Sequence, residues 1–542
     1  MPVRRPLGDE RYHAIVIGGG INGVAIARAC ALAGKRTLLL EQHDFASGTT
    51  SRSTRIIHGG LRYLEHKEIG LVRESLRERE RLLRQRPHLV HPINFLLALN
   101  QNSRRSALSV RTGLWLYSRM GGSLGTQLGK VDQQKLERNL DAGRRWSVFN
   151  FEDAQCEFPE RLVAEWLVEA IDAGAVARNH AQVLAIDVRH GRAQGVLVRD
   201  EFTGKEERVE GTWIINASGP WVDRLCHRSR VNANARLIGG VRGSHIVLPR
   251  FAGVSEAAVY AEAMDGRPMF VVPWNDQVLV GTTEVSDNGD PSRTQATPEE
   301  VEYLLRSLQQ LFPKTKFSPN DIAYTFAGVR PLPYSPNQSP AAVTRKHFLH
   351  DHKNDGAANM ISVIGGKLTT AAQLARECVA KIGAKSRSPE LSFAVADGNL
   401  DSLLQEWTQS IIEEGSIPET TAQAIVEWHG KRASAIARRT RESAQMRAPL
   451  CSHTEHIVAE AVDAFSHQCA ATLGDVLLRR VPVALGACWS DACSRSAAMR
   501  IATVMRWSDS QTAAELEAFE NERAEFLRKP ARRNVLLQTA AD

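Results

Sequence analysis

The sequence lacks a membrane-spanning segment and a cysteine framework. No apolar run in its 542 residues reaches the roughly 18 residues that a spanning helix needs. The N-terminal residues are basic but hold no apolar block with a cleavage site, so we expect no secretory signal. The eight cysteines show no CxxC motif and no pairing pattern. Reduced thiols, a cytoplasmic setting and no bound metal are therefore expected.

Acidic residues are absent between Arg81 and Val131. Residues 62–145 hold 17 Lys/Arg against 8 Asp/Glu, an excess larger than the +7 of the whole chain. Aromatic residues do not alternate with these charges as nucleic-acid stacking requires, so nucleic acid is not the expected partner. Arginines instead flank an apolar cluster around Trp115 and Tyr117, which suits an anionic membrane surface. A solvated basic face is the alternative.

The overall composition describes a foldable, soluble protein. Hydrophobic residues make up 43% of the chain and charged residues 24%. Its length exceeds what one ordinary hydrophobic core supports, so roughly two to four domains are expected.

A nucleotide-binding motif lies near the N-terminus, in HAIVIGGGINGVAIARACALAGKRTLLLEQHD. The pattern predicts strands over 14–17 and 37–40 and a helix over 24–33. The first strand and the helix are joined by G-x-G-x-x-G, formed by Gly18, Gly20 and Gly23. These glycines allow a tight turn, close approach of a pyrophosphate to the helix N-terminus, and close helix–strand packing. Glu41 ends the second strand, where a carboxylate accepts from both ribose hydroxyls, which favours NAD or FAD over NADP.

A second glycine-rich motif, VIGGKLTT, lies near residue 363. It fails the P-loop pattern, because Leu368 follows the lysine where Ser or Thr is needed. Lys367 could hold a nucleotide, hold a substrate, or only end a strand.

Further long motifs occur between these two. They are GTTSRSTRIIHGGLRYLE (48–65), WIINASGPW (213–221), RGSHIVLPR (242–250), FVVPWNDQVLVGTTE (270–284), FAGVRPLP (326–333), AAVTRKH (341–347) and ISVIGGKLTTAAQLA (361–375). With these motifs in this order, the sequence resembles the FAD-dependent, quinone-linked glycerol-3-phosphate dehydrogenases, within the flavin amine/amino-acid oxidase-like superfamily. The resemblance covers residues 11–375 and continues more weakly in the last 140 residues.

The resemblance implies an α/β fold with a discontinuous FAD-binding Rossmann-like domain, an inserted β-rich substrate domain and an all-α C-terminal domain. The oxidoreductase region would span 11–385, with flavin-domain segments at 11–80, 150–240 and 355–385 and substrate segments at 81–149 and 241–354. Residues 384–400 would connect it to a helical domain over 400–540, for packing or for dimer or partner contact. Residues 361–366 would form a strand of the same sheet as residues 14–17, followed by a helix starting near Leu368.

The implied cofactor is non-covalent FAD, with Gly365 and Gly366 turning under its isoalloxazine ring. The expected cofactor contacts are Gly18, Gly20, Gly23, Glu41, Thr50, Ser51, Ser53, His58, Gly219, Gly366, Lys367, Leu368 and Thr369.

The implied reaction moves a hydride from C2 of sn-glycerol 3-phosphate to FAD, gives dihydroxyacetone phosphate and passes electrons to a quinone. The expected substrate contacts are Arg62, Tyr63, Arg330 and Arg345, since arginine binds phosphate bidentately. Arg330 also counts among the catalytic residues. His245 is the first candidate for the base that takes the hydroxyl proton. Lys367 is the second, and could instead polarise the forming carbonyl.

Some positions depart from the family pattern. Arg242 stands where Lys is frequent, Glu284 where Asp is frequent, Ala371-Ala372 where Tyr-Arg is frequent, and FPERL (158–162) where an acidic turn is frequent. Two other functions stay open: an amino-acid or amine oxidase of the same fold, and a non-catalytic FAD sensor. The expected location is the cytoplasm, with peripheral attachment to the cytoplasmic membrane, and a homodimer is possible.

Overall fold

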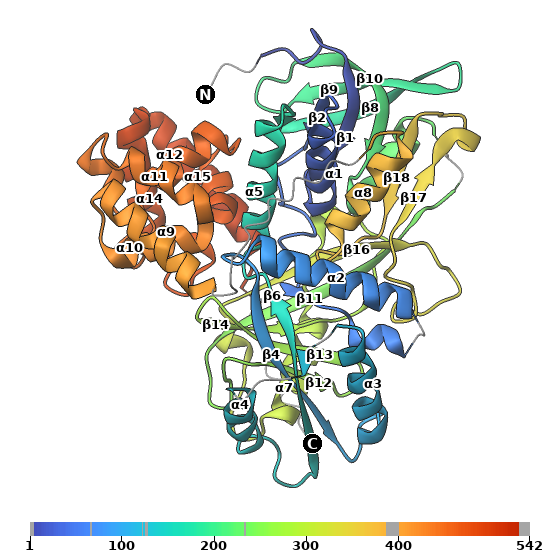
Figure 1. The fold of residues 1–542 in the computed structure, drawn as a ribbon, viewed down its shortest axis with the longest axis vertical. Helices are drawn as coiled ribbons and strands as arrows, with labels where there is room; N and C mark the ends of the chain where they lie inside the picture. Colours follow the sequence, from blue (N-terminus) through green and yellow to red (C-terminus); the bar gives the residue numbers. More distant parts are fainter. Residues whose placement is uncertain are drawn as a thin grey trace, which may run out of the picture.

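The computed structural model describes residues 5–65, 68–121, 123–124, 128–231, 235–385 and 400–529. Two sheets lie one above the other in Figure 1, and the helices of the C-terminal region form a third body beside them. Most of the expected connector 384–400 lies outside the described residues.

The first sheet is built around parallel strands that are buried on both faces. Its order is β17-β18-β10-β1-β2-β7, and β8 and β9 extend it from β10. The bounds are β1 Tyr12–Ile17, β2 Thr37–Leu40, β7 Val176–Arg178, β8 Ala181–Arg189, β9 Arg192–Asp200, β10 Glu206–Asn216, β17 Phe348–Asp351 and β18 Met360–Ile364. The expectation that residues 361–366 join the sheet of residues 14–17 is confirmed, with β10 between them.

Side-chain alternation along β1 divides the core around this sheet. Ala14 and Val16 pack with α1 (Ile21–Leu32), α5 (Pro159–Asp172) and α8 (Ala371–Lys381) on one face. Tyr12, Ile15 and Ile17 pack with β8, β9 and α6 (Val222–Arg228) on the other. A strand covered on both faces shows a continuous apolar run, which is why AIVI was recognisable in the sequence.

Two helix starts differ from the sequence expectation. α1 begins at Ile21 instead of residue 24, and α8 begins at Ala371 instead of near Leu368. The residues Leu368 to Thr370 form a turn, so that Thr369 faces the cavity described below before the helix starts.

The second sheet is larger and mostly antiparallel. Its order is β15-β11-β14-β13-β12-β4-β6-β3, with β16 paired to β11 and β5 to β6. The strands are β3 Ile56–Ile57, β4 His91–Asn100, β5 Ser123–Leu124, β6 Trp146–Gln155, β11 Ile238–Pro249, β12 Ala258–Glu262, β13 Pro268–Trp274, β14 Gln277–Gly281, β15 Val285–Ser286 and β16 Tyr324–Pro333. The accompanying helices are α2 Ile69–Gln85, α3 Ala107–Arg119, α4 Leu128–Glu137 and α7 Pro298–Leu311. A capping box formed by Thr297 and Glu300 begins α7.

The C-terminal region is helical, as expected. Its helices are α9 Leu400–Gly415, α10 Glu419–His429, α11 Ala433–Arg439, α12 Val458–His467, α13 Leu473–Asp475, α14 Asp491–Met505 and α15 Asp509–Phe526. A π-helical turn, Val476–Arg480, follows α13.

A buried ion network joins this helical body to the first sheet. Asp44, shortly after β2, accepts two hydrogen bonds of 2.8 Å from the guanidinium of Arg480 and one from Arg479. Arg479 also binds Asp475, which accepts from His180 at 3.0 Å. The four side chains of Asp44, Asp475, Arg479 and Arg480 are each at most 4% exposed. A charge buried this deeply is stable only while its partners stay in place, so the network fixes the helical body against the sheet.

We predict that Asp44→Asn destabilises the protein by about 3–5 kcal/mol, because it leaves the buried guanidinium of Arg480 without its counter-charge and Arg479 without one of its carboxylates. The midpoint of thermal unfolding with excess FAD measures this. Glu201→Gln is the control, since it removes an exposed ion pair with Arg199 that contributes little. Equal midpoints for the two variants would contradict the role given to Asp44.

Candidate active site

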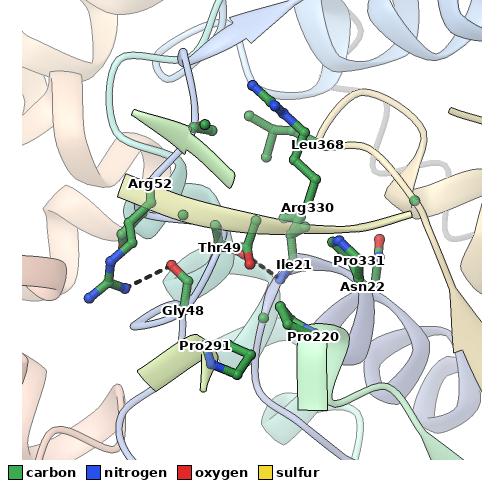
Figure 2. A pocket seen from close by; sticks show the side chains of 18 of the residues that line it. Ile21, Asn22, Gly48, Thr49, Arg52, Pro220, Pro291, Arg330, Pro331 and Leu368 are labelled. Atoms are coloured by element: carbon green, nitrogen blue, oxygen red, sulfur yellow. Dashed lines mark hydrogen bonds between the residues drawn. The ribbon is translucent and has the colours of Figure 1, made fainter. Parts of the chain in front are cut away.

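A cavity of about 710 Å³ lies at the carboxyl ends of β1, β10 and β18, between the two sheets. In Figure 2 strand β16 crosses the cavity and carries Arg330 and Pro331. Most residues expected from the sequence line it: Gly18, Gly20, Glu41, Thr50, Ser51, Ser53, His58, Tyr63, Gly219, His245, Arg330, Arg345, Gly366, Lys367, Leu368 and Thr369. The side chain of Arg62 lies outside the described residues.

The first glycine turn leaves no room for side chains. Gly18 has a φ of +105°, and a Cβ there would lie 2.6 Å from the carbonyl oxygen of Ala217. A Cβ on Gly23 would lie 1.8 Å from the oxygen of Gly18. Gly23 does not line the cavity; its absence of a side chain lets α1 sit against the turn. The N–H of Ile21, the first residue of α1, donates to Thr50 Oγ1 at 3.1 Å.

Glu41 is held at the end of β2 by backbone donors. Its carboxylate accepts from the N–H of Gly19 at 2.6 Å and from the N–H of His43 at 2.9 Å. Burial raises the pKa of Glu41, and the two hydrogen bonds oppose that shift. The carboxylate thus stands beside the glycine turn, at the cavity wall, where a ribose would meet it.

The two glycine-rich motifs touch each other. Asn22 Nδ2 donates to the carbonyl oxygen of Gly365 at 3.3 Å, across 343 residues of sequence. A Cβ on Gly366 would lie 2.3 Å from the same Nδ2 atom, and both Gly365 and Gly366 have positive φ. Among the described residues, the buried Oδ1 atom of Asn22 has no hydrogen-bond partner. Asn22 thus couples the nucleotide turn to the turn before Lys367 and keeps an acceptor for a ligand.

Lys367 lines the cavity just after the Gly365-Gly366 turn. Its ammonium donates to Ser75 Oγ at 2.7 Å and lies 4.5 Å from the centre of the Tyr63 ring. Burial lowers its pKa to about 7, although the carboxylates of Glu74 and Glu68 oppose the shift. Lys367 therefore changes its protonation state near neutral pH.

Arg330 and Arg345, two of the arginines expected to bind the substrate, differ in their hydrogen-bond partners. Arg330 donates to Thr282 Oγ1 at 2.9 Å and to the carbonyl oxygen of Thr283 at 3.4 Å. Arg345 forms an ion pair of 2.7 Å with Glu284, one of the positions that departs from the family pattern. Its charge is therefore already balanced by a carboxylate, whereas the two hydrogen bonds of Arg330 named above go to neutral oxygens.

The two candidate histidines are neutral. His245 Nε2 lies 2.9 Å from Thr54 Oγ1, and its ring stacks on Phe326. Burial lowers the pKa of His245 to about 3, with further lowering by the charges of Arg330 and Arg55. Burial and the charge of Lys367 lower the pKa of His58 to about 3 as well.

The C-terminal region contributes to the cavity, which the sequence did not predict. Glu522, Glu525 and Phe526, at the end of α15, line it. The guanidinium of Arg52 lies 4.8 Å from the centre of the Phe526 ring and donates to the carbonyl oxygen of Gly48, as the dashed line in Figure 2 shows. A lone aromatic residue at a helix end carries no sequence signal for such a contact.

Comparisons with known proteins agree with this geometry. Residues 13–372 match the family described as FAD dependent oxidoreductase, and residues 361–512 match the C-terminal domain of alpha-glycerophosphate oxidase. The chain is 36% identical over 496 residues to a glycerol-3-phosphate dehydrogenase of Synechocystis, covering 88% of this chain and 90% of that protein. The chain belongs to the FAD-dependent glycerol-3-phosphate dehydrogenase family.

Two further relatives show the breadth of this family. D-erythritol 1-phosphate dehydrogenase of Brucella abortus is 36% identical over 370 residues, which cover 68% of this chain and 72% of that protein. The structure of glycerol-3-phosphate dehydrogenase from Bacillus halodurans complexed with FAD has a TM-score of 0.74, with 21% identity and 96% coverage of both chains. The expected fold and cofactor are confirmed: this is an FAD-dependent oxidoreductase.

We predict that Glu41→Gln weakens FAD binding by roughly 10- to 150-fold, because it removes a charged acceptor, a loss of about 1.5–3 kcal/mol. Titration of the apoprotein with FAD, followed by flavin fluorescence, measures the change. Glu210→Gln, an exposed change in β10 of the same sheet, is the control. Unaltered FAD affinity in Glu41→Gln would show that this carboxylate does not hold the ribose.

Proposed function

We propose that this chain oxidises a polyol phosphate, most simply sn-glycerol 3-phosphate, at C2. FAD accepts a hydride in this chemistry, and the product of the simplest substrate is dihydroxyacetone phosphate. The observation that carries the proposal is a cavity lined by Arg330, from β16 of the second sheet, and by Lys367, from the turn that follows β18 of the first sheet. A phosphomonoester near neutral pH has a charge of about −1.5 to −2, which such cations stabilise.

The alternatives are weaker for a physical reason. An amino-acid oxidase of the same fold binds one carboxylate, whereas this cavity offers a bidentate guanidinium, Arg330, whose hydrogen bonds named above go to neutral oxygens, with Lys367 on the same cavity wall. A non-catalytic flavoprotein would not need a buried lysine whose pKa is lowered to about 7. A four-carbon polyol phosphate is the serious rival, because the D-erythritol 1-phosphate dehydrogenase matches as closely as most of the glycerol-3-phosphate dehydrogenases do.

Anaerobic bleaching of the flavin tests the proposal directly. sn-Glycerol 3-phosphate is expected to bleach the 450 nm region, and glycine and proline are not; D-erythritol 1-phosphate tests the rival substrate.

Arg330→Ala should keep FAD and raise the half-saturating concentration of the preferred phosphate by about 10- to 150-fold, the equivalent of 1.5–3 kcal/mol. Arg199→Ala, on the far strand β9, is the control. Reduction by an amino acid alone would overturn the proposal.

The base of the reaction is better supplied by Lys367 than by His245. A general base works best when its pKa lies near the working pH. Burial, and after it the charges of Arg330 and Arg55, lowers the pKa of His245 to about 3 and so disfavours a proton on its ring. The amine form of Lys367, with a pKa lowered to about 7, is populated at neutral pH and can take the hydroxyl proton of the substrate. His245 then keeps a positioning role next to Thr54.

We therefore predict that kcat/KM rises with pH up to about 7 and then levels, as Lys367 loses its proton. Lys367→Met should keep FAD and slow flavin reduction about 10²-fold or more. Lys367→Arg keeps a cation that cannot be deprotonated, and should be equally slow. Rapid-mixing anaerobic reduction measures both variants. A fast Lys367→Arg variant would instead support a role as a permanent cation.

The electron acceptor is proposed to be a quinone, reached from the membrane surface. Among the described residues no helix is long and apolar enough to cross a membrane. The expected surface around residues 81–131 needs correction: Tyr117 is buried and donates to Asp153, so it is not a membrane contact. Several of the arginines are paired with carboxylates, such as Arg86 with Glu169. The membrane proposal therefore rests on a smaller patch of α3.

That patch combines apolar and basic side chains. Leu108 is 75% exposed and Trp115 57% exposed, and Arg111 and Arg119 are exposed on the same helix. The guanidinium of Arg119 lies 5.5 Å from the centre of the Trp115 ring. Aromatic and basic residues together suit the interface of an anionic bilayer.

We predict that the protein sediments with anionic vesicles at low salt and is released at high salt. Leu108→Ser combined with Trp115→Ser should reduce the bound fraction at least about 10-fold, since each side chain contributes about 1.5–3 kcal/mol when fully buried. Met499→Ser removes an equally exposed apolar residue from α14 and is the control. Equal binding by both variants would rule out α3 as the anchor.

A further inference from the structure

Four metal-ligating residues gather in the C-terminal region, far from the flavin cavity. Cys451 and His453 lie in one loop, and Cys488 and Cys493 lie 35 and more residues later, before and at the start of α14. The ligand atoms of Cys451, His453 and Cys493 lie within 4.8 Å of one another. None of the four lines the active-site cavity. The sequence did not suggest this group, because neither C-x-H nor C-x4-C stood out alone.

The loop that carries Cys451 and His453 is closed like a short hairpin. Pro449 and Ile457 form an antiparallel bridge, and the N–H of Leu450 donates to the oxygen of His456 at 2.8 Å. The backbone N–H of His453 interacts with the Cys451 thiol. A tight turn that presents a sulfur and a ring nitrogen in the same direction is suited to chelation.

Cys488 and Cys493 are positioned by the segment that leads into α14. Ser490 caps this helix by accepting from the N–H of Cys493, and its hydroxyl donates to Cys493 Sγ at 3.4 Å. Cys493 Sγ lies 3.5 Å from His453 Nδ1. A hydrogen bond and a helix N-terminus both favour the thiolate, which is the form that binds metal. Trp489, between the two cysteines, is buried and donates to Ser494 Oγ at 3.0 Å, which anchors this segment.

Cys488 is the nearest further cysteine and the candidate for a fourth ligand. Its side chain is exposed and lies outside the 4.8 Å group, so it would have to turn toward the other three ligand atoms. Cys493 Sγ is 3.6 Å from the backbone oxygen of Cys488, so the two residues are neighbours. Cys451 and Cys493 are buried while His453 and Cys488 are exposed, an arrangement that leaves an entry path from solvent.

We propose that Cys451, His453, Cys488 and Cys493 bind one structural Zn²⁺ ion. Three thiolates and one imidazole form a donor set that structural zinc sites use, with tetrahedral geometry and Zn–S distances of about 2.3 Å. Sulfur atoms about such an ion stand roughly 3.8 Å apart, a separation compatible with the observed grouping of Cys451 and Cys493 with His453. Binding releases the thiol protons that remain and clamps the loop at 448–457 to the start of α14.

The metal content of the purified holoenzyme tests this site. Protein prepared under reducing conditions without chelator should hold about one zinc per chain by mass spectrometry, and Co²⁺ added to the apo-site should give thiolate charge-transfer bands. Cys493→Ser should lose the metal. His453→Ala changes an exposed side chain and so tests the site even if Cys493→Ser fails to fold. Cys469→Ser, a cysteine of the same region outside the group, is the control.

Three outcomes would overturn the proposal. The first is a reduced wild-type protein that holds no zinc and binds neither Zn²⁺ nor Co²⁺. The second is zinc content that is the same in His453→Ala and Cys493→Ser as in wild type, which means adventitious metal elsewhere. The third is a Cys451–Cys493 disulfide in the native protein, found by peptide mapping. If the site is structural, chelation lowers the thermal midpoint while flavin reduction by substrate in the folded protein is unchanged.

Discussion

The active site depends on one contact between distant parts of the chain: the bond from Asn22 to the carbonyl oxygen of Gly365. Parallel pairing of β1, β10 and β18 brings both residues to the same sheet edge. Gly18, Gly23 and Gly366 lack a side chain, so neighbouring atoms lie closer to them than a Cβ atom would permit. The nucleotide turn and the turn that carries Lys367 are therefore parts of one cavity wall, as open α/β sheets provide at their carboxyl edge.

The buried ion network around Asp44 holds in place the part of the cavity wall that the C-terminal helices form. The Asp44 network fixes the C-terminal helices to the end of β2, only three residues after Glu41. The end of α15 thereby reaches the cavity, where Phe526 lies against Arg52. The helical region is thus part of the active site's construction as well as a separate body, and the proposed zinc site would stabilise the start of α14 within it.

Sequence analysis predicted the parts of the site that carry local signals. GxGxxG with Glu41 follows from spacing, and the helical C-terminal region follows from the family resemblance. The features of the site that the sequence did not predict depend on tertiary packing. Nothing near Asn22, Asp44 or Phe526 indicates which residue each one meets, and Tyr117 looked like a surface aromatic although it is buried on Asp153. The pairing of Arg345 with Glu284 is equally invisible in sequence, yet it decides how much charge remains for a substrate.

The most direct test of the account is a crystal structure of the holoenzyme with dihydroxyacetone phosphate. The account predicts FAD along the Gly18 and Gly366 turns, the phosphate on Arg330, and the C2 oxygen within hydrogen-bond distance of Lys367 Nζ. A product bound with its phosphate away from Arg330, or with Lys367 still turned to Ser75 and out of reach of the C2 oxygen, would contradict it.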